Sequence, residues 1–216
     1  MKPELLYARR CCALLIIAFF ATAAFSQKIK IGLQGGGNYA GLQMSAKSHP
    51  LIDNQTKAIF GGQVNLFLEK QLGAHPFSVS AEPGVVFKGY SEPVAGTYPE
   101  NRFNFRLTYL NLPLVVNYFP VKRLGFSIGT ELNYLLSTQV DGDNSQFVLD
   151  YLNRFEIAGL AGIQYKITKR WTLGGRYMHG ITPLQKISIA DVEGIPDGEV
   201  ARRNRTGQVF VRYVLN

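Results

Sequence analysis

The sequence predicts an all-β fold, an eight-stranded antiparallel up-and-down β-barrel that spans a membrane. Apolar and polar residues alternate with a period of two along nearly the whole chain after residue 28, which indicates strands with two chemically different faces. The connections between these segments are alternately short and long, and aromatic residues concentrate near segment ends. Together these three patterns are typical of a barrel whose apolar face contacts lipid.

The N-terminal segment predicts export. Basic residues precede the apolar run Cys11–Phe25, which ends in small residues and is shorter than the roughly 20 residues of a membrane-spanning helix. We therefore expect a cleaved signal peptide at residues 1–26 and a single barrel domain at residues 27–216, a retained membrane anchor being the alternative. Both cysteines, Cys11 and Cys12, would leave with the signal peptide, so the exported chain would hold neither a disulfide nor a thiolate metal site.

Eight strands account for the alternation, and amphipathic helical patterns are absent from the same region. The strands are expected at Lys28–Tyr39, Ile59–Lys70, Phe77–Gly89, Arg102–Tyr118, Leu124–Ser137, Arg154–Ile167, Arg170–Ile181 and Thr206–Asn216. Short links (QLGAHP, FPVKR and TK) alternate with long ones at Ala40–Ala58, Tyr90–Asn101, Thr138–Asn153 and Thr182–Arg205. Tight turns on one rim and long loops on the other are the arrangement of outer-membrane barrels, whose long loops face the outside.

The alternation leaves open which face of each strand meets water. In the stretch YLNLPLVVNYF, Tyr109–Phe119, leucine, valine and tyrosine occupy one face, whereas asparagine and proline occupy the other. A soluble barrel would turn the apolar face inward, but its outer face would then be rich in Gly and Ser and poor in charge. We therefore expect the apolar faces to meet lipid. Nine aromatic residues would then form the interfacial girdles: Phe77, Phe87, Tyr118, Phe126, Tyr134, Phe155, Tyr165, Trp171 and Tyr177.

One strand changes parity along its length. Phe103, Phe105 and Leu107 are apolar at positions that are out of phase with Leu110 and the residues after it. A β-bulge near Tyr109 would account for this change, as would an extension of the strand above the membrane.

The polar faces would line a narrow lumen. Eight strands enclose an interior that side chains can fill, so we do not expect a general diffusion pore. Buried charges of both signs must pair or hydrogen-bond, which predicts an ion-pair network that plugs the lumen, with a proton or ion pathway as the alternative. Its expected members are Glu82, Lys88, Glu131, Glu156, Lys166, Arg176 and Arg212, accompanied by Gln34, Gln63, Asn65 and Gln164.

Catalytic and metal-binding motifs are weak, and we expect no cofactor and no metal. Glu131 and Glu156 could serve as an acid and a base, but lumen carboxylates beside arginines are more often structural. His179 is expected on the lipid face near the outer rim, where a lipid-modifying enzyme would act, although no serine has a clear position beside it. The DGDN segment, Asp141–Asn144, lacks the rest of a calcium loop, which favours an ordinary polar turn. The run Gly35–Gly37 precedes no helix, so it fits strand bending or tight packing better than a phosphate loop.

The signal ending FSQ and five later segments carry a resemblance to a known family. The five segments are IGLQGGGNYAG, YLNLPLVVNYF, GFSIGTELNYLLS, FEIAGLAGIQYKI and GGRYMHGITPL, and they follow one another through the whole exported chain. They resemble the PorT-like outer-membrane β-barrel proteins of Bacteroidota, with Asn111 where that family usually has Glu and Asn117 where it usually has Lys. The resemblance implies an integral outer-membrane barrel; a few similar members serve a protein-secretion system.

Three functions are compatible with these patterns. The first is a noncatalytic barrel with a plugged lumen that anchors or assembles a cell-surface or protein-secretion complex through its extracellular loops, of which Leu184–Arg205 mixes charged and apolar residues. The second is a barrel enzyme that modifies outer-leaflet lipid with His179, and the third is a soluble exported barrel that binds an apolar ligand.

The expected partners are outer-membrane lipids, including lipopolysaccharide, and envelope or secretion-system proteins. Basic residues of the short-turn rim would contact phospholipid headgroups. Nucleic acid is not expected despite the net charge of +8, because the basic residues are scattered among the strands. The barrel is expected to be a monomer.

Overall fold

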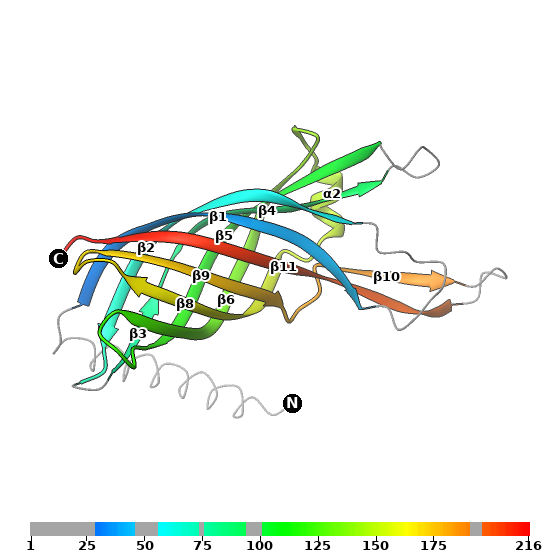
Figure 1. The fold of residues 1–216 in the computed structure, drawn as a ribbon. Helices are drawn as coiled ribbons and strands as arrows, with labels where there is room; N and C mark the ends of the chain where they lie inside the picture. The colour runs from blue at the N-terminus through cyan, green and yellow to red at the C-terminus, as the bar shows by residue number, and fades with distance from the viewer. Residues whose placement is uncertain (1–28, 46–55, 74–75, 94–100, 191–195) are drawn as a thin grey trace, which may run out of the picture.

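The structure, a computed structural model, is an antiparallel β-barrel (Figure 1). It describes residues 29–45, 56–73, 76–93, 101–190 and 196–216, so the expected signal peptide and the domain boundary at residue 27 lie outside the described residues. The C-terminus lies at the end of the barrel that carries the short connections (Figure 1).

Eight strand positions close the barrel, which confirms the predicted fold class. The wall consists of β1 (Ile29–Ser45), β2 (Lys57–Gln71), β3 (Phe77–Ala81), β4 (Gly84–Pro93), β5 (Arg102–Tyr118), β6 (Leu124–Val140), β8 (Phe155–Lys166), β9 (Trp171–Gly180) and β11 (Pro196–Val214). β3 and β4 both pair with β2 and β5, so together they occupy one position. The ring closes where β1 pairs with β11.

The third strand was predicted to be continuous, and this is wrong: it is interrupted at Glu82 and Pro83. A proline has no backbone N–H and cannot donate a ladder hydrogen bond. At the break, the Glu82 N–H donates to the Pro113 carbonyl over 2.9 Å and the Leu66 N–H donates to the Pro83 carbonyl over 2.8 Å. The wall therefore stays hydrogen-bonded across the interruption.

The long connections contain secondary structure that the sequence analysis assigned to loops. β7 (Asp143–Asn144) pairs with the end of β6 and is followed by the short helix α2 (Gln146–Tyr151), whose N-cap is Ser145. β10 (Gln185–Ala190) pairs with β11, which begins at Pro196 and not at Thr206. A helix of six residues is too short to produce a readable periodic pattern. Among the described residues, no helix is long and apolar enough to cross a membrane.

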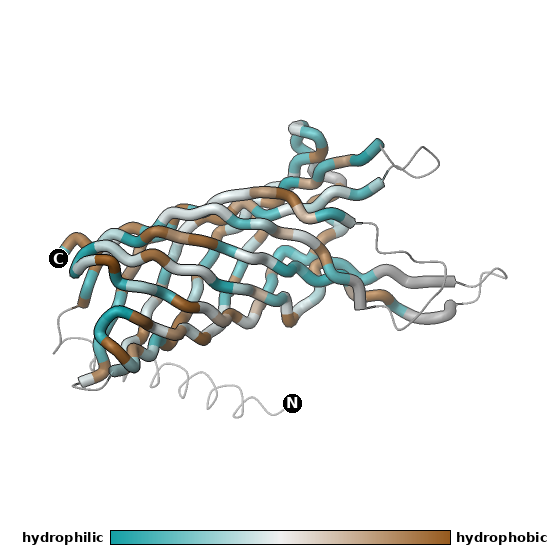
Figure 2. Tube along the Cα trace, in the orientation of Figure 1, coloured by the Kyte–Doolittle hydropathy of each residue, from teal (hydrophilic) through white to brown (hydrophobic). Residues whose placement is uncertain are grey.

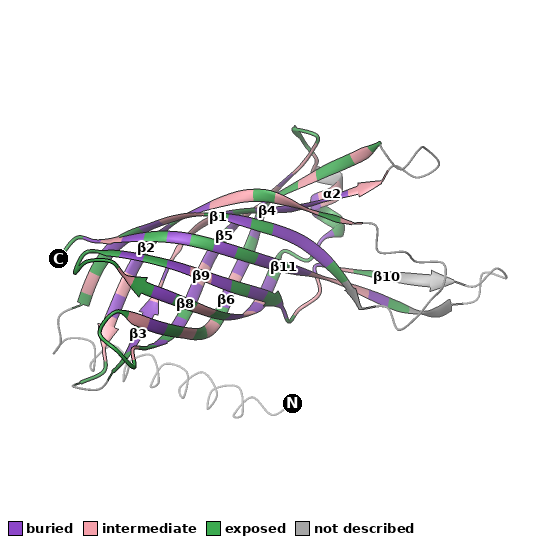
Figure 3. Ribbon diagram, in the orientation of Figure 1, coloured by how far each residue is buried: buried purple, intermediate pink, exposed green. Residues whose placement is uncertain are grey.

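The apolar face of the wall points outward. Exposed and buried residues alternate along the barrel strands (Figure 3), and apolar positions recur along the same strands (Figure 2). The exposed fraction reaches 83% for Phe60, 67% for Ile128 and 66% for Val64. A water-soluble barrel would bury these residues, so the soluble alternative is wrong.

The predicted β-bulge near Tyr109 is confirmed. The pairing of β5 with β6 shifts register between Thr108 and Tyr109. Thr108 pairs with Ser137 and Tyr109 with Leu135, so the extra residue of the bulge is Leu136 on β6. The alternation of burial along β5 itself is not interrupted, because Leu107, Tyr109 and Asn111 are all at most 1% exposed, and the apolar side chain of Leu107 therefore faces the lumen.

Candidate functional site in the barrel lumen

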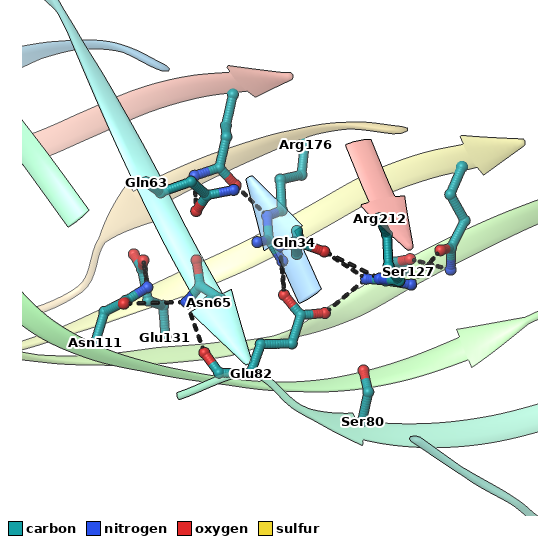
Figure 4. Close-up of polar contacts among 12 residues, drawn as sticks. Gln34, Gln63, Asn65, Ser80, Glu82, Asn111, Ser127, Glu131, Arg176 and Arg212 are labelled. Atoms are coloured by element: carbon teal, nitrogen blue, oxygen red, sulfur yellow. Dashed lines mark hydrogen bonds and ion pairs between the residues drawn. The ribbon is translucent and has the colours of Figure 1, made fainter. Parts of the chain in front are cut away.

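Glu82 lies between two arginines in the middle of the lumen (Figure 4). One carboxylate oxygen, Oε2, is 2.7 Å from Nη1 of Arg176 and accepts a hydrogen bond from Gln34 over 2.9 Å. The other, Oε1, is 2.8 Å from Nη2 of Arg212. The side chains of the three charged residues are at most 5% exposed, so this carboxylate is paired with two cations in a nearly dry environment.

Arg212 makes hydrogen bonds through its guanidinium and lies near two aromatic rings. Its guanidinium donates to Gln34 over 2.8 Å and to Gln164 over 2.9 Å. The ring of Phe67 has its centroid 3.7 Å from Cζ of Arg212, and that of Phe210 lies at 5.2 Å. Phe67 and Phe210 were not among the predicted lumen residues. Their inward parity was the available signal, because an aromatic residue on a polar face suits cation–π contact with a lumen arginine.

A second ion-pair cluster surrounds Lys88. Its Nζ atom is 2.8 Å from Oε2 of Glu131 and 4.0 Å from Oε1 of Glu156, and all three side chains are 1% exposed. Asn133 donates to Glu131 over 3.1 Å, and Asn204 donates to Glu156. The cluster thus joins one cation to two buried carboxylates.

Amide side chains connect the two clusters. Nδ2 of Asn65 donates to the Glu82 backbone carbonyl over 2.7 Å and to Oδ1 of Asn111 over 3.1 Å. Asn111 in turn donates to Glu131 over 3.3 Å. On the other side, Nε of Arg176 donates to Gln208, which donates to Gln63. A chain of buried polar groups therefore runs along the lumen.

Lys166 is separate from these ion pairs, although sequence analysis included it in the network. It is half-buried near the short-turn rim, and its Nζ atom lies 3.4 Å from the centroid of the Phe119 ring. Parity placed its side chain inward, but its position at the last residue of β8 puts it at the rim.

An apolar cluster occupies the lumen toward the long-loop end. Its buried members are Leu42, Val86, Tyr90, Leu107, Tyr109, Leu135, Leu149, Leu152 and Leu184. Leu149 comes from α2, and Leu152 is its C-cap, so the helix covers this cluster. The hydroxyl of Tyr109 accepts a hydrogen bond from Asn204 over 3.2 Å, which links the apolar cluster to the Lys88 cluster.

All nine aromatic residues expected at the interfaces are exposed on the outer wall, between 39% and 53%. Phe77 and Tyr118 stack with ring centroids 4.8 Å apart near the short-turn rim, and Tyr134 pairs in register with Phe155 toward the other rim. Side chains of this kind at two levels of the wall suit the two membrane–water interfaces.

His179 and the DGDN segment have ordinary surroundings. His179 is exposed on the outer wall, and its directly paired positions are Gly159 and Arg205, neither of which is a nucleophile. Asp141, at φ 50°, and Gly142, at φ 100°, form a tight turn between β6 and β7, and Oδ1 of Asp141 accepts from the Asn104 N–H over 2.9 Å. Within the ranges that the structure describes, no group of three or more His, Cys, Asp or Glu side chains is placed to hold a metal ion.

A closed barrel with a lipid-compatible outer wall and a polar interior defines an integral outer-membrane protein. The model of the outer membrane protein beta-barrel domain family matches residues 25–186, and the chain belongs to this family. The predicted location in the outer membrane agrees with this membership. The finer resemblance to PorT-like proteins of Bacteroidota stays a prediction.

The chain also matches solved structures, of which the first described here has a similar fold. Neisserial surface protein A shares 11% identity over 88% of this chain and 100% of its own, with a TM-score of 0.52. Ail of Yersinia pestis, bound to a heparin analogue, shares 10% identity over 87% of this chain and 99% of its own, with a TM-score of 0.46. OprG of Pseudomonas aeruginosa shares 14% identity over 88% of this chain and 97% of its own, with a TM-score of 0.45. No curated protein sequence matches the chain.

Proposed function

We propose that the protein is a noncatalytic outer-membrane barrel with a plugged lumen, which anchors or assembles a cell-surface or protein-secretion complex through its extracellular part. The observation that carries this proposal is the sheet formed by β10 and the first half of β11, which projects beyond the rest of the barrel (Figure 1). Family membership supports the orientation, because long connections of such barrels face the outside.

The lumen supports a plug in two ways. Its central charges pair with one another, with Glu82 between two arginines and Lys88 beside two glutamates. Above them, the apolar cluster under α2 offers water no hydrogen-bonding partners along its leucine side chains. Ion passage would require these paired charges and packed leucines to separate, which is costly in a low-dielectric interior.

The projecting sheet supports partner binding because its backbone is preorganised. β11 continues from Asn204 to Pro196 beyond the level of Arg205, which corresponds to about 30 Å at roughly 3.4 Å per residue. It is paired with β10 over much of this length, and Nη1 of Arg202 lies 2.6 Å from Oε1 of Glu92 on β4, which ties the sheet to the barrel. A rigid surface loses less conformational entropy on binding than a flexible loop.

Conductance tests the plug. Purified wild-type protein inserted into a planar lipid bilayer is expected to give no stable single-channel steps. As a control, heat-sensitive gel migration of the same protein preparation shows that the barrel is folded. Regular steps from folded wild-type protein would contradict the plugged lumen.

Site-specific crosslinking in intact cells tests the assembly role. A photoreactive amino acid at Glu199, which is exposed on the projecting sheet, is expected to give a discrete adduct of higher mass. The matched control is Lys122, which is exposed at the short-turn rim. Equal adducts from both positions, or no adduct from Glu199 in a folded barrel, would argue against an extracellular docking surface.

A further inference from the structure

Glycines on the barrel wall fall into two groups. Those facing inward are closely packed: a Cβ atom on Gly36 would lie 2.1 Å from the Val209 carbonyl oxygen, and one on Gly174 would lie 2.3 Å from the Phe210 ring. Those facing outward on β1, β9 and β11 have room. A Cβ atom would meet nothing within 4 Å at Gly207, only the Gly61 carbonyl oxygen at 4.0 Å at Gly37, and the Gln208 carbonyl oxygen at 3.7 Å at Gly175. Internal packing does not require glycine at the outward positions, where larger apolar side chains would suit lipid.

The strand register arranges these glycines into a branched groove. Gly207 pairs with Tyr39 on one side and Tyr177 on the other, so the groove passes between two exposed tyrosines. Two residues further along β11, Val209 pairs with Gly37 and Gly175, so the groove divides around the Val209 side chain.

Three hollows follow this path along the wall. The upper hollow, of about 320 Å³, is lined by Tyr39, Tyr177, Arg205 and Gly207. The branch over Gly37 measures about 440 Å³ and shares Tyr39 and Gly207 with the upper hollow. The branch over Gly175 measures about 340 Å³ and shares Val209 with the first branch. The side chains that line the two lower hollows are mostly apolar or aromatic, which suits hydrocarbon chains.

The upper end of the groove is positively charged. Arg205 pairs in register with His179, and its guanidinium makes no hydrogen bond or ion pair with any of the described residues. Arg203 lies two residues further from the membrane and uses Nε to donate to the Ile181 carbonyl over 3.2 Å. The adjoining strands β1 and β9 contain no acidic residue. An exposed guanidinium at the membrane surface that no described side chain neutralises is suited to phosphate.

We propose that this groove binds a phosphorylated, multiply acylated lipid of the outer leaflet. The phosphate pairs with Arg205, and acyl chains occupy the branches on either side of Val209. The part of the groove from Arg205 to its branch point at Val209 lies within one leaflet. These four steps along the strand span about 14 Å, or roughly 10 Å along the membrane normal at the usual tilt, which is less than half of the ~30 Å hydrocarbon core. The proposal rests on the outer-membrane location and not on the assembly role.

A second copy of the barrel is a poorer occupant of the groove. Two barrels that meet through the same face are related by a twofold axis along the membrane normal, so equivalent residues face one another at the same height. The Arg205 side chains of both copies would then approach each other without an acidic partner on β1 or β9.

Lipid binding by variants tests the charged end of the groove. Folded barrel in detergent is titrated with diphosphorylated hexa-acyl lipid A and followed by native mass spectrometry. Arg205→Ala is expected to weaken binding about tenfold, because a charge-assisted hydrogen bond is lost. The matched control is Arg106→Ala. Arg106 is exposed on β5, which lies on the opposite side of the barrel, four strand positions from β11 in either direction. This variant is expected to bind lipid A as the wild type does. Equal binding by both variants would overturn the phosphate assignment, as would equal binding of dephosphorylated lipid A to the wild type.

Filling the groove tests its apolar part. Gly37→Leu and Gly207→Leu are expected to abolish lipid retention while preserving heat-sensitive gel migration, which reports a folded barrel. Thr130→Leu, an exposed position on β6, is the control and is expected to retain lipid. Retention of lipid by a folded Gly37→Leu or Gly207→Leu barrel would overturn the proposal. A stable dimer of the wild type that is lost in Gly37→Leu would also overturn the proposal, because the groove would then bind a second copy of the barrel. The lipid readout does not depend on crosslinking at Glu199, so failure of either proposal leaves the other standing.

Discussion

Replacing Lys88 by methionine removes the cation of the second lumen cluster and keeps a side chain of similar length. In the wild type, Nζ of Lys88 is 2.8 Å from Glu131 and 4.0 Å from Glu156, with all three side chains 1% exposed. Lys88→Met would leave two buried carboxylates without this compensating charge. Breaking a buried pair in this way costs about 3–5 kcal/mol, so the free energy of unfolding is expected to fall by that amount.

Glu131→Gln is the matched variant and should cost less. The amide oxygen can still accept from Lys88 and Asn133, and Lys88 keeps Glu156 as a charged neighbour. We expect a loss of about 1–2 kcal/mol. The double variant should be more stable than the sum of the single losses predicts, because Lys88 and Glu131 interact directly.

The assay is equilibrium unfolding by guanidinium in lipid vesicles, followed by tryptophan fluorescence and by gel migration without boiling. The two probes must coincide for a two-state free energy to be derived. If Lys88→Met costs no more than Glu131→Gln, or costs less than about 1 kcal/mol, the reasoning is refuted. That result would mean that water reaches the lumen and screens its charges.

Four further measurements follow from the structure. The unboiled protein is expected to migrate faster than the boiled protein in gels, and identical migration would contradict a closed barrel. Gly129→Val should abolish this shift, because a Cβ atom there would lie 2.1 Å from a carbonyl oxygen, whereas Gly207→Val should preserve it. Phe67→Leu removes a ring whose centroid is 3.7 Å from Cζ of Arg212 and should lower the unfolding free energy by about 1–2 kcal/mol in the same guanidinium assay; an unchanged value would show that the cation–π contact is unimportant. His179→Ala should leave the lipid A profile of cells unchanged in mass spectra, and an altered profile would contradict a noncatalytic barrel.

Strand positions and face assignments could be predicted because they depend on local geometry. Successive side chains of a strand point to opposite faces, so the parity of Glu82 and Lys88 relative to Phe77 and Phe87 could be read from the sequence. In the structure the two charged residues are 1% and 2% exposed, and the two aromatic residues are 41% and 49% exposed. Lys166 shows where parity is insufficient, since depth along the barrel also decides burial.

The sequence by itself determined the class of barrel and its outward apolar face, because both follow from a period of two along single strands. Only the tertiary structure decided which lumen charges meet. Glu82 is 94 residues from Arg176 and 130 from Arg212, and their contact depends on how eight strands are staggered when β1 closes against β11. The burial of α2 also depends on tertiary structure. It requires leucines and tyrosines that four strands, β1, β4, β5 and β6, bring to one end of the lumen. The alternation of residues within one strand carries no information about how far neighbouring strands are shifted relative to one another. This shift determines which side chains meet across the lumen.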